Sequence, residues 1–353
     1  MQQELLVTKL ISRILIVGLG SIGSRHLYFA RERFPTAEIK ILSHQTQNTR
    51  PEFSNGYLST IEEAIQFAPQ IAVIANPSTF HIPIAQALAQ IETHLFVEKP
   101  LSASSEGVIK LINTCKEHNS VLMIGYNLRF SASLQRFRKF LHEGIIGELL
   151  SVRCEVGQYL PSWRPESDYR QGVSARKELG GGALLELSHE IDYLRWIFGE
   201  VDWVKTTLSK QSKLEIDVED TAHLTMGFLP NSDGRQLIGT LNLDLIRHDN
   251  TRTCTVIGEK GTLRWNGLTG EVDLFEESAT SWNRLFHHQP EKDETYRAEW
   301  QDFTDSIQDK KIPFVSGNDG LRVLEIIEAA RTSALCGAQE LTSHSHRLSR
   351  PSV

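Results

Sequence analysis

The sequence predicts a two-domain protein in which a doubly wound, parallel α/β sheet is followed by an open, mostly antiparallel sheet. The chain has 353 residues, more than a single hydrophobic core usually organises. Between residues 13 and about 147, short apolar runs alternate with amphipathic stretches of helical period, which is typical of parallel strands joined by helices. Beyond residue 147 the apolar segments become longer and richer in β-forming residues, with turn residues between several of them.

The first domain is expected to cover residues 1–147, with residues 1–12 as an N-terminal extension. Right-handed crossovers between its parallel strands would cover both faces of the sheet. Ser59 and Thr60 are placed to cap the second of its helices. The expected strands are 14–17, 39–42, 71–75, 95–97 and 121–124, and the expected helices are 22–33, 61–67, 82–90 and 106–118.

The second domain is expected to cover residues 148–339, and the polar segment 340–353 is expected to be a flexible tail. An apolar-periodic helix at 183–198 interrupts its strands, and a late helix at about 319–335 is expected to pack back on the first domain. The expected strands are 151–158, 202–208, 221–228, 237–245, 253–258 and 262–265.

The composition narrows the classes of function. Hydrophobic residues make up 40% of the chain and charged residues 23%, as in ordinary globular proteins. A net charge of -7 offers no positive field for nucleic acid, which is therefore not an expected partner. The four cysteines lie far apart, so neither a zinc site nor a redox pair is expected, and no other metal site is predicted. Because neither an export signal nor an apolar run of about 18 residues occurs, we expect a cytoplasmic protein with no membrane partner.

A glycine loop, Gly18-Leu19-Gly20-Ser21-Ile22-Gly23, directly follows an apolar strand and opens a helix. In that context the three glycines meet three separate needs of dinucleotide binding. Gly18 makes a tight turn, Gly20 lets the pyrophosphate approach the backbone, and Gly23 lets the helix pack on the strand. The N–H groups at the helix start, around Ser21 and Ile22, would hold the phosphates. The alternative is a glycine turn that binds nothing.

The choice between NAD and NADP depends on the end of the second strand. Glu38 lies at the usual sequence distance for a ribose-binding acid, but it precedes the apolar part of that strand. The carboxyl end carries Ser43, His44 and Gln45 instead. No carboxylate there would repel a 2′-phosphate, and Ser43 and His44 can hydrogen-bond one, so NADP is favoured over NAD. His44 packing near the adenine is the alternative.

Three segments behind the glycine loop carry a family resemblance: Glu98-Lys99-Pro100, residues 126–130 (YNLRF) and residues 180–192 (GGGALLELSHEID). In this order, and over about residues 13–335, the chain resembles the Gfo/Idh/MocA oxidoreductases. The resemblance implies a Rossmann domain followed by an open β-sheet domain, a nicotinamide cofactor, and a sugar, polyol or nucleotide-sugar substrate. It also implies a homodimer or homotetramer formed through the C-terminal sheet.

Lys99 is the first candidate for catalysis. It follows the apolar strand 95–97 at the carboxyl end, where ligands bind in open α/β sheets. Its ammonium group can hydrogen-bond a substrate hydroxyl and stabilise the alkoxide that develops as hydride leaves. The resemblance implies a role of this kind, and Pro100 would hold the turn that aims the side chain. A solvated loop lysine is the alternative reading.

The predicted helix 183–198 carries Glu186, His189 and Asp192 at three-residue steps, which would place them on one face. His189 suits general acid–base transfer of the hydroxyl proton, with Asp192 or Glu186 orienting its ring. The family usually has an aspartate four residues before this histidine, where this chain has Leu185. The alternative is a core histidine bonded to the backbone.

Further contacts are expected at neighbouring strand ends. The loop 76–81 (NPSTFH) is suited to the nicotinamide ribose, or Ser78 and Thr79 merely cap a helix. Arg129 belongs either to the same crevice or to a structural ion pair. The expected cofactor contacts beyond the glycine loop, Ser43 and His44 are Asn76, Pro77, Ser78, His81, Glu98 and Lys99, and the first substrate contacts are Tyr126, Asn127 and Arg129.

The segment 157–176 combines aromatic and arginine side chains between a strand and the predicted catalytic helix. Aromatic faces stack on sugars or bases, and arginines bind phosphate or carboxylate, which favours a nucleotide sugar or an acidic sugar over plain inositol. An oligomer contact is the alternative. The expected substrate contacts here are Tyr159, Trp163, Arg164, Tyr169, Arg170 and Ser174, with Arg176 as a further candidate.

The sequence therefore predicts an NAD(P)-dependent oxidoreductase that transfers hydride between nicotinamide and a sugar hydroxyl or keto carbon. A regulator that senses dinucleotide and sugar without turnover is the alternative on the same scaffold. The presence of both Lys99 and His189 favours the enzyme.

Overall fold

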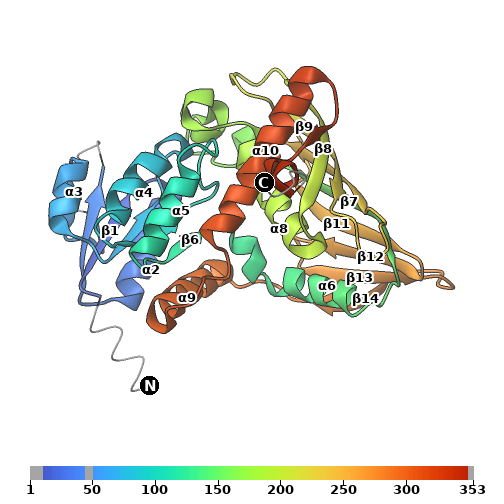
Figure 1. Ribbon diagram of the computed structural model, residues 1–353, viewed down its shortest axis with the longest axis horizontal. Helices are drawn as coiled ribbons and strands as arrows, with labels where there is room; N and C mark the ends of the chain where they lie inside the picture. The colour runs from blue at the N-terminus through green and yellow to red at the C-terminus, as the bar shows by residue number, and fades with distance from the viewer. Residues whose placement is uncertain (1–10, 44–50, 349–353) are drawn as a thin grey trace. The chain divides into compact units, whose positions relative to one another are not determined.

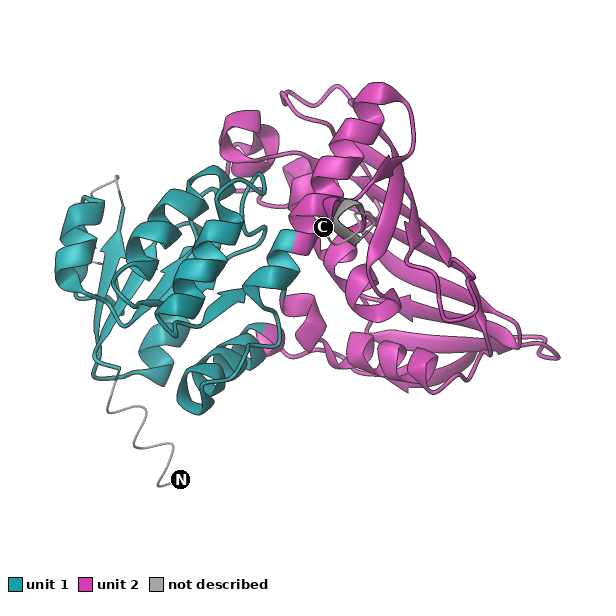
Figure 2. Ribbon diagram, in the orientation of Figure 1, with its two compact units in different colours: residues 1–126, 296–321 teal, residues 127–295, 322–353 magenta. Residues whose placement is uncertain are grey.

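The computed structural model describes residues 11–43 and 51–348, which fall into two compact units (Figure 2). Unit 1 comprises residues 1–126 and 296–321, and unit 2 comprises residues 127–295 and 322–353. The chain thus passes from unit 1 to unit 2 after Tyr126 rather than near Gly147. Residues 132–142 form a helix in unit 2. It is bound to the sheet of that unit, because Ser133 on the helix accepts a 3.0 Å hydrogen bond from the indole N–H of Trp265.

Unit 1 is built on a six-stranded, all-parallel sheet in the order β3-β2-β1-β4-β5-β6, of which Figure 1 labels β1 and β6. Its central strands are almost wholly buried aliphatic runs, as expected for a sheet covered on both faces. The strands are β1 Arg13–Val17, β2 Glu38–Leu42, β3 Gly56–Leu58, β4 Ile71–Ile74, β5 His94–Val97 and β6 Leu122–Ile124. The helices are α2 Ser21–Arg33, α3 Ile61–Phe67, α4 His81–Ala89, α5 Val108–Glu117 and α9 Glu294–Asp309.

The register of this sheet aligns the ends of four strands. Val17 pairs with Ile74, Ile74 with Val97, and Val97 with Ile124. The segments that follow these residues leave the sheet together at its carboxyl edge. The strand order also reverses between β1 and β4, and such a switch point is where open α/β sheets bind ligands.

Unit 2 is built on a nine-stranded sheet in the order β14-β13-β12-β11-β7-β10-β9-β8-β15, in which only the β7 and β10 pair is parallel. The strands are β7 Leu149–Gly157, β8 Val201–Ser209, β9 Thr221–Phe228, β10 Ile238–Asp244, β11 Thr251–Gly258, β12 Gly261–Asn266, β13 Glu271–Glu276, β14 Asn283–His287 and β15 Glu340–Leu341. The helices are α6 Ala132–His142, α7 Ala183–Glu186, α8 His189–Phe198 and α11 Ser343–Leu348, and α10 Gly317–Cys336 crosses the division between the units.

The predicted fold class is confirmed, whereas several local expectations are wrong or incomplete. The helix expected over 183–198 is two helices, α7 and α8, interrupted at Leu187 and Ser188. Helix α9 was not expected from the sequence. The start of the expected tail is regular structure, because β15 pairs with β8 and the Thr342 hydroxyl donates a 2.9 Å bond to the Val201 carbonyl.

Two negative findings apply to residues 11–43 and 51–348. No helix there is long and apolar enough to cross a membrane. The same residues contain no group of three or more histidine, cysteine or acidic side chains that could hold a metal ion.

Candidate active site

The glycine loop occupies the carboxyl end of β1, and each glycine has the geometry that its expected role requires. Gly18 adopts a φ of +84°, and a Cβ atom there would lie 2.9 Å from the Asn76 nitrogen. A Cβ on Gly23 would lie 2.2 Å from the Gly18 carbonyl oxygen. A Cβ on Gly20 would meet nothing within 4 Å, so this position leaves open space in front of the first turn of α2. A phosphate group fits this arrangement of exposed backbone.

The loop after β4 lies next to the glycine loop and contains buried polar atoms that lack partners. Asn76 Oδ1, Ser78 Oγ and Thr79 Oγ1 have no hydrogen-bond partner within the described chain. Buried polar atoms are rarely left unbonded, so these three groups fit a bound molecule with hydroxyl or amide groups. Helix capping by Ser78 and Thr79 is wrong, because neither hydroxyl forms a cap bond.

His81 is fully buried at the start of α4 and joins two strand-end loops. Its Nε2 lies 2.7 Å from the Asn76 carbonyl oxygen, and its Nδ1 lies 3.1 Å from that of Pro100. Burial lowers the pKa of His81, whereas the carbonyl groups and the charge of Glu98 act in the opposite direction. His81 is thus a brace behind the expected cofactor loop.

Lys99 is half-buried directly after β5, where the sequence placed it, and the Lys99–Pro100 peptide bond is cis. The preceding Glu98 is buried. Its Oε2 accepts the Lys99 backbone N–H at 3.0 Å, and its Oε1 lies 2.7 Å from His26 Nε2. His26 is not among the site residues expected from the sequence. Its signal was the position three residues after Gly23, on the buried face of the same helix.

Three further described candidates are Ser43, Tyr126 and Asn127. Ser43 is described at the end of β2, where its N–H donates to the Leu58 carbonyl at 3.2 Å, whereas His44 lies outside the described residues. Tyr126 is fully buried at the end of unit 1. Asn127, in unit 2, donates from Nδ2 to the Thr295 hydroxyl at 2.9 Å.

The glycine-rich turn before α7 positions a second set of candidate residues, which belongs to unit 2. Gly182 has a φ of +104°, and a Cβ there would lie 2.4 Å from Glu219 Oε1. Glu219 accepts the Leu184 N–H at 3.1 Å, and its backbone carbonyl accepts the Ala183 N–H at 3.0 Å. Burial raises the pKa of this carboxyl. The turn therefore depends on a residue that the sequence reasoning did not single out.

His189 is the first residue of α8 and is half-buried. Glu186 ends α7, so the expected face shared by Glu186, His189 and Asp192 on one helix does not exist. Asp192 and Arg129 form a buried ion pair with bonds of 2.8 and 2.6 Å. The structural alternative for Arg129 is therefore confirmed. Glu190, which directly follows His189, is wholly buried and accepts a 2.7 Å hydrogen bond from Arg252 on β11.

The arginines of the segment 157–176 differ in whether a neighbouring side chain binds their guanidinium group. Arg170 bonds Asp168 and Glu215, and Arg176 bonds Gln171 and Glu178. Among the described residues, no carboxylate pairs with the guanidinium of Arg164, and this side chain is exposed.

The aromatic residues of this segment are also anchored. The rings of Tyr159 and His248 pack at a tilt with centroids 4.2 Å apart, and Trp163 donates to the Gln158 carbonyl at 3.3 Å. The Tyr169 hydroxyl accepts the Glu215 N–H at 3.3 Å, and the Ser174 carbonyl accepts the Gly182 N–H at 3.1 Å. The segment is therefore tied directly to the turn that precedes α7.

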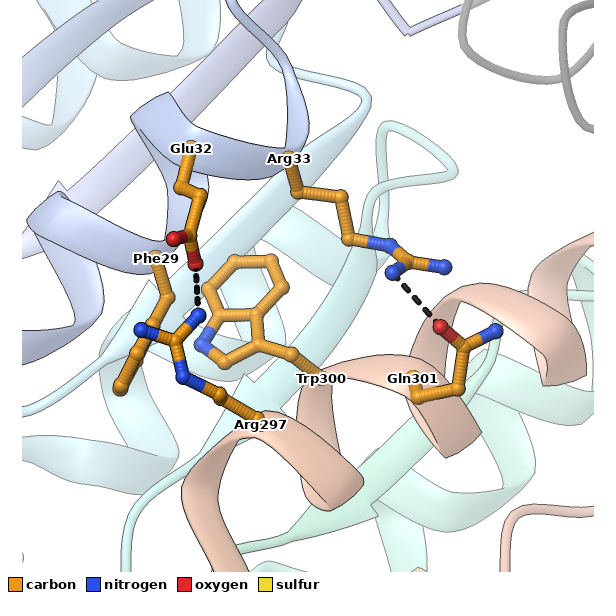
Figure 3. Close-up of a pocket in the computed structure, with 6 residues that line it drawn as sticks. All are labelled: Phe29, Glu32, Arg33, Arg297, Trp300 and Gln301. Atoms are coloured by element: carbon orange, nitrogen blue, oxygen red, sulfur yellow. Dashed lines mark hydrogen bonds and ion pairs between the residues drawn. The ribbon is translucent and has the colours of Figure 1, made fainter. Parts of the chain in front are cut away.

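A separate cleft in unit 1 lies between the C-terminal part of α2 and α9 (Figure 3). Phe29 and Trp300 form its apolar wall, and polar bridges cross it between Glu32 and Arg297 and between Arg33 and Gln301. Because the glycine loop precedes the opposite end of α2, this cleft is not part of the candidate site.

Comparison with known proteins supports the two-domain fold described above. The family model for the NAD-binding Rossmann fold of the Gfo/Idh/MocA oxidoreductases matches residues 12–126, and that for the family's C-terminal alpha/beta domain matches residues 138–338. The myo-inositol 2-dehydrogenase of Thermotoga maritima is 24% identical over 339 residues, which are 91% of this chain and 96% of the relative.

Two solved structures share the fold. A levoglucosan dehydrogenase in complex with NADH has a TM-score of 0.78 at 24% identity, over 94% of this chain and 99% of that chain. The WlbA dehydrogenase of Bordetella pertussis, in complex with NADH and UDP-GlcNAcA, has a TM-score of 0.75 at 22% identity, over 94% of this chain and 98% of that chain. The two family models together cover most of the chain, and it therefore belongs to the Gfo/Idh/MocA family of NAD-binding oxidoreductases.

Proposed function

We propose that this protein is an NAD(P)-dependent dehydrogenase or reductase that acts on a CH–OH carbon of a nucleotide sugar or an acidic sugar. The observation that carries the proposal is the carboxyl edge of the first sheet. There the glycine loop, the unpartnered oxygens of Asn76, Ser78 and Thr79, and Lys99 follow strands whose ends are in register. A nicotinamide dinucleotide bound at this edge would accept or supply the hydride.

Lys99 is proposed to stabilise the substrate oxygen. A cationic ammonium next to that oxygen favours the alkoxide over the hydroxyl, and this preference increases as hydride leaves the carbon. Glu98 and His81 hold the backbone on both sides of Lys99, so the side chain starts from a fixed turn.

His189 is proposed to take the hydroxyl proton in the oxidative direction and to return it in the reductive direction. Helix α8 is anchored by bonds from Arg129 to Asp192 and from Arg252 to Glu190, which hold the residues that follow His189. In this proposal the role of Asp192 is to help hold the helix that begins with His189. Glu186, at the end of α7, stays the candidate for orienting the imidazole ring.

The substrate class rests on the loop chemistry of unit 2. Arg170 and Arg176 pair with neighbouring carboxylates, whereas no carboxylate among the described residues pairs with Arg164. The tilted ring pair of Tyr159 and His248 offers an aromatic surface. Together they suit a substrate with an anionic group and a ring. WlbA, which shares the fold, was crystallised with a nucleotide-linked acidic sugar.

The test is a panel of UDP-sugars, sugar acids, inositol and levoglucosan, each incubated with NAD+ or NADP+ while nicotinamide absorbance is followed. We expect turnover of an anionic sugar, with kcat reduced by at least about 100-fold in Lys99→Ala and in His189→Ala. Lys110→Ala, at an exposed position on α5, is the matched control. Full activity of both site variants would refute the proposed roles. Tight binding without turnover by the wild type would instead identify a sensor.

We further propose a homodimer or homotetramer that buries the open face of the second sheet. The exposed residues along β10 alternate strictly with buried ones, so one face of the strand is uncovered within this chain. Light scattering of the purified protein tests this. A monomer at micromolar concentration would contradict it, and Thr240→Arg on the exposed face is expected to weaken the assembly.

A further inference from the structure

The Glu98 carboxylate is held by a chain of hydrogen bonds whose direction is set by a tryptophan. The Trp300 indole N–H lies 3.0 Å from His26 Nδ1. An indole nitrogen can only donate, so Nδ1 of His26 must accept and carries no proton. A neutral ring then has its proton on Nε2, which donates to Glu98 Oε1 at 2.7 Å. Three elements, α9, α2 and the end of β5, thus contribute one residue each to a directed chain.

The surroundings of Glu98 leave little freedom for another arrangement. A Cβ on Gly125 would lie 3.0 to 3.2 Å from the carboxylate atoms of Glu98, so glycine provides the room on that side. His26 is wholly buried, and its ring packs edge-on against Phe96 with centroids 4.8 Å apart. The second oxygen of Glu98 accepts the Lys99 N–H. The carboxylate is therefore held from one side by His26 and holds the Lys99 backbone on the other.

The ionisable groups facing Glu98 come from α2, α4 and α9. They are His26, His81, Tyr296 and Glu299, besides Lys99. Burial and the charge of Glu98 both raise the pKa of Tyr296 and of Glu299. Glu299 is completely buried, and neither of its oxygens has a hydrogen-bond partner in the described chain. Burial and the neighbouring charge therefore both favour the protonated, neutral form of Tyr296 and of Glu299.

We propose that His26 is a positioning residue for Lys99: it fixes the Glu98 carboxylate, and Glu98 fixes the backbone from which the Lys99 side chain extends. The proposal rests on the catalytic role proposed above for Lys99. It makes His26 and Trp300 contributors to turnover although neither needs to touch the substrate.

The first test needs no substrate or cofactor. Isotope-labelled histidine in the full-length protein gives imidazole nitrogen NMR signals, and the His26 signal is identified by its loss in His26→Gln. We expect one protonated nitrogen, Nε2, and one acceptor nitrogen, Nδ1, at neutral pH. A proton on Nδ1, or on both nitrogens, would overturn the proposed chain of bonds.

The second test measures kcat and cofactor affinity separately. His26→Leu removes both hydrogen bonds, and we expect kcat to fall by about 10- to 100-fold while the cofactor Kd changes by less than about threefold. His26→Gln should restore most of the activity, because an amide can donate to Glu98 and accept from Trp300. If His26→Leu does not fold, Trp300→Phe removes one bond of the chain and is expected to lower kcat less, again with little effect on Kd.

His118→Gln is the matched control, because His118 also faces a glutamate, Glu92, at 3.7 Å, but on the surface of unit 1. It should leave kcat unchanged. A folded His26→Leu with wild-type kcat, in an enzyme that Lys99→Ala inactivates, would refute the positioning role and leave the proposed function standing. A fully active Lys99→Ala would refute the proposed function instead, whatever the His26 variants show.

Discussion

Arg129 holds both carboxylate oxygens of Asp192, with Nε 2.8 Å from Oδ2 and Nη2 2.6 Å from Oδ1. Both side chains are almost fully buried, at 3% and 2% exposure, so neither charge is solvated if its partner is lost. The pair fastens α8, which begins at His189, to the 3-10 turn that follows Tyr126.

Removal of either partner is therefore expected to destabilise unit 2 strongly. Arg129→Ala and Asp192→Ala should each lower the free energy of unfolding by about 3–5 kcal/mol, the usual consequence of leaving a buried charge unpaired. The double variant should lose less than the sum of the two. Urea unfolding of all four proteins gives the coupling energy. Strictly additive losses of unfolding free energy would show that Arg129 and Asp192 are not energetically coupled.

The glycine loop allows stability to be separated from cofactor binding. Gly20→Ala adds a methyl group to open space, so the melting temperature should stay within the error of the wild type while cofactor affinity falls by at least about tenfold. Gly18→Ala places a Cβ 2.9 Å from Asn76 nitrogen at a φ of +84°, and should reduce both quantities. Differential scanning fluorimetry and cofactor titration measure them. Equal cofactor affinity in Gly20→Ala and the wild type would show that the cofactor phosphates do not bind at this loop.

Cofactor preference depends on the end of β2. Ser43→Asp places a carboxylate where a 2′-phosphate would be held, and charge repulsion should shift the NADP/NAD ratio of kcat/KM toward NAD by at least about tenfold. Ser43→Asn is the neutral control and should shift the ratio far less. An unchanged ratio in Ser43→Asp would show that the 2′-position lies elsewhere.

Sequence periodicity predicted the first sheet well because each of its central strands is a short aliphatic run followed directly by turn residues. The site residues Gly18, Asn76 and Lys99 could be placed because register brings the ends of parallel strands to one edge. The break at Ser188 could not be predicted, because the apolar period continues across it from Leu185 to Ile191.

The hydrogen bonds that connect distant segments could not be predicted from the sequence either. His26 and Glu98 are 72 residues apart, and Trp300 reaches His26 from 274 residues away. Helix α9 buries only a narrow stripe of residues, and Glu299 is one of them. Because a buried acid does not contribute to an apolar helical pattern, the sequence did not predict this helix. Tertiary packing determines such positions, and local propensity does not encode them.

That buried acid leads to a prediction of pH dependence. Burial and the neighbouring charge of Glu98 raise the folded-state pKa of Glu299 well above its ordinary value of 4.5. Stability contributed by its protonated form is complete below the unfolded pKa and is lost as pH rises toward the folded one. Glu299→Gln keeps the shape of the neutral acid but cannot ionise in the unfolded chain.

The variant and the wild type should therefore unfold with similar free energies near pH 4, and the variant should become progressively more stable above it. Within the window between the two pKa values the difference grows by up to about 1.4 kcal/mol per pH unit. Urea unfolding at several pH values measures it, and Glu117→Gln, at an exposed position on α5, controls for the loss of an acid. A difference that is constant with pH would mean that the folded-state pKa of Glu299 is not raised.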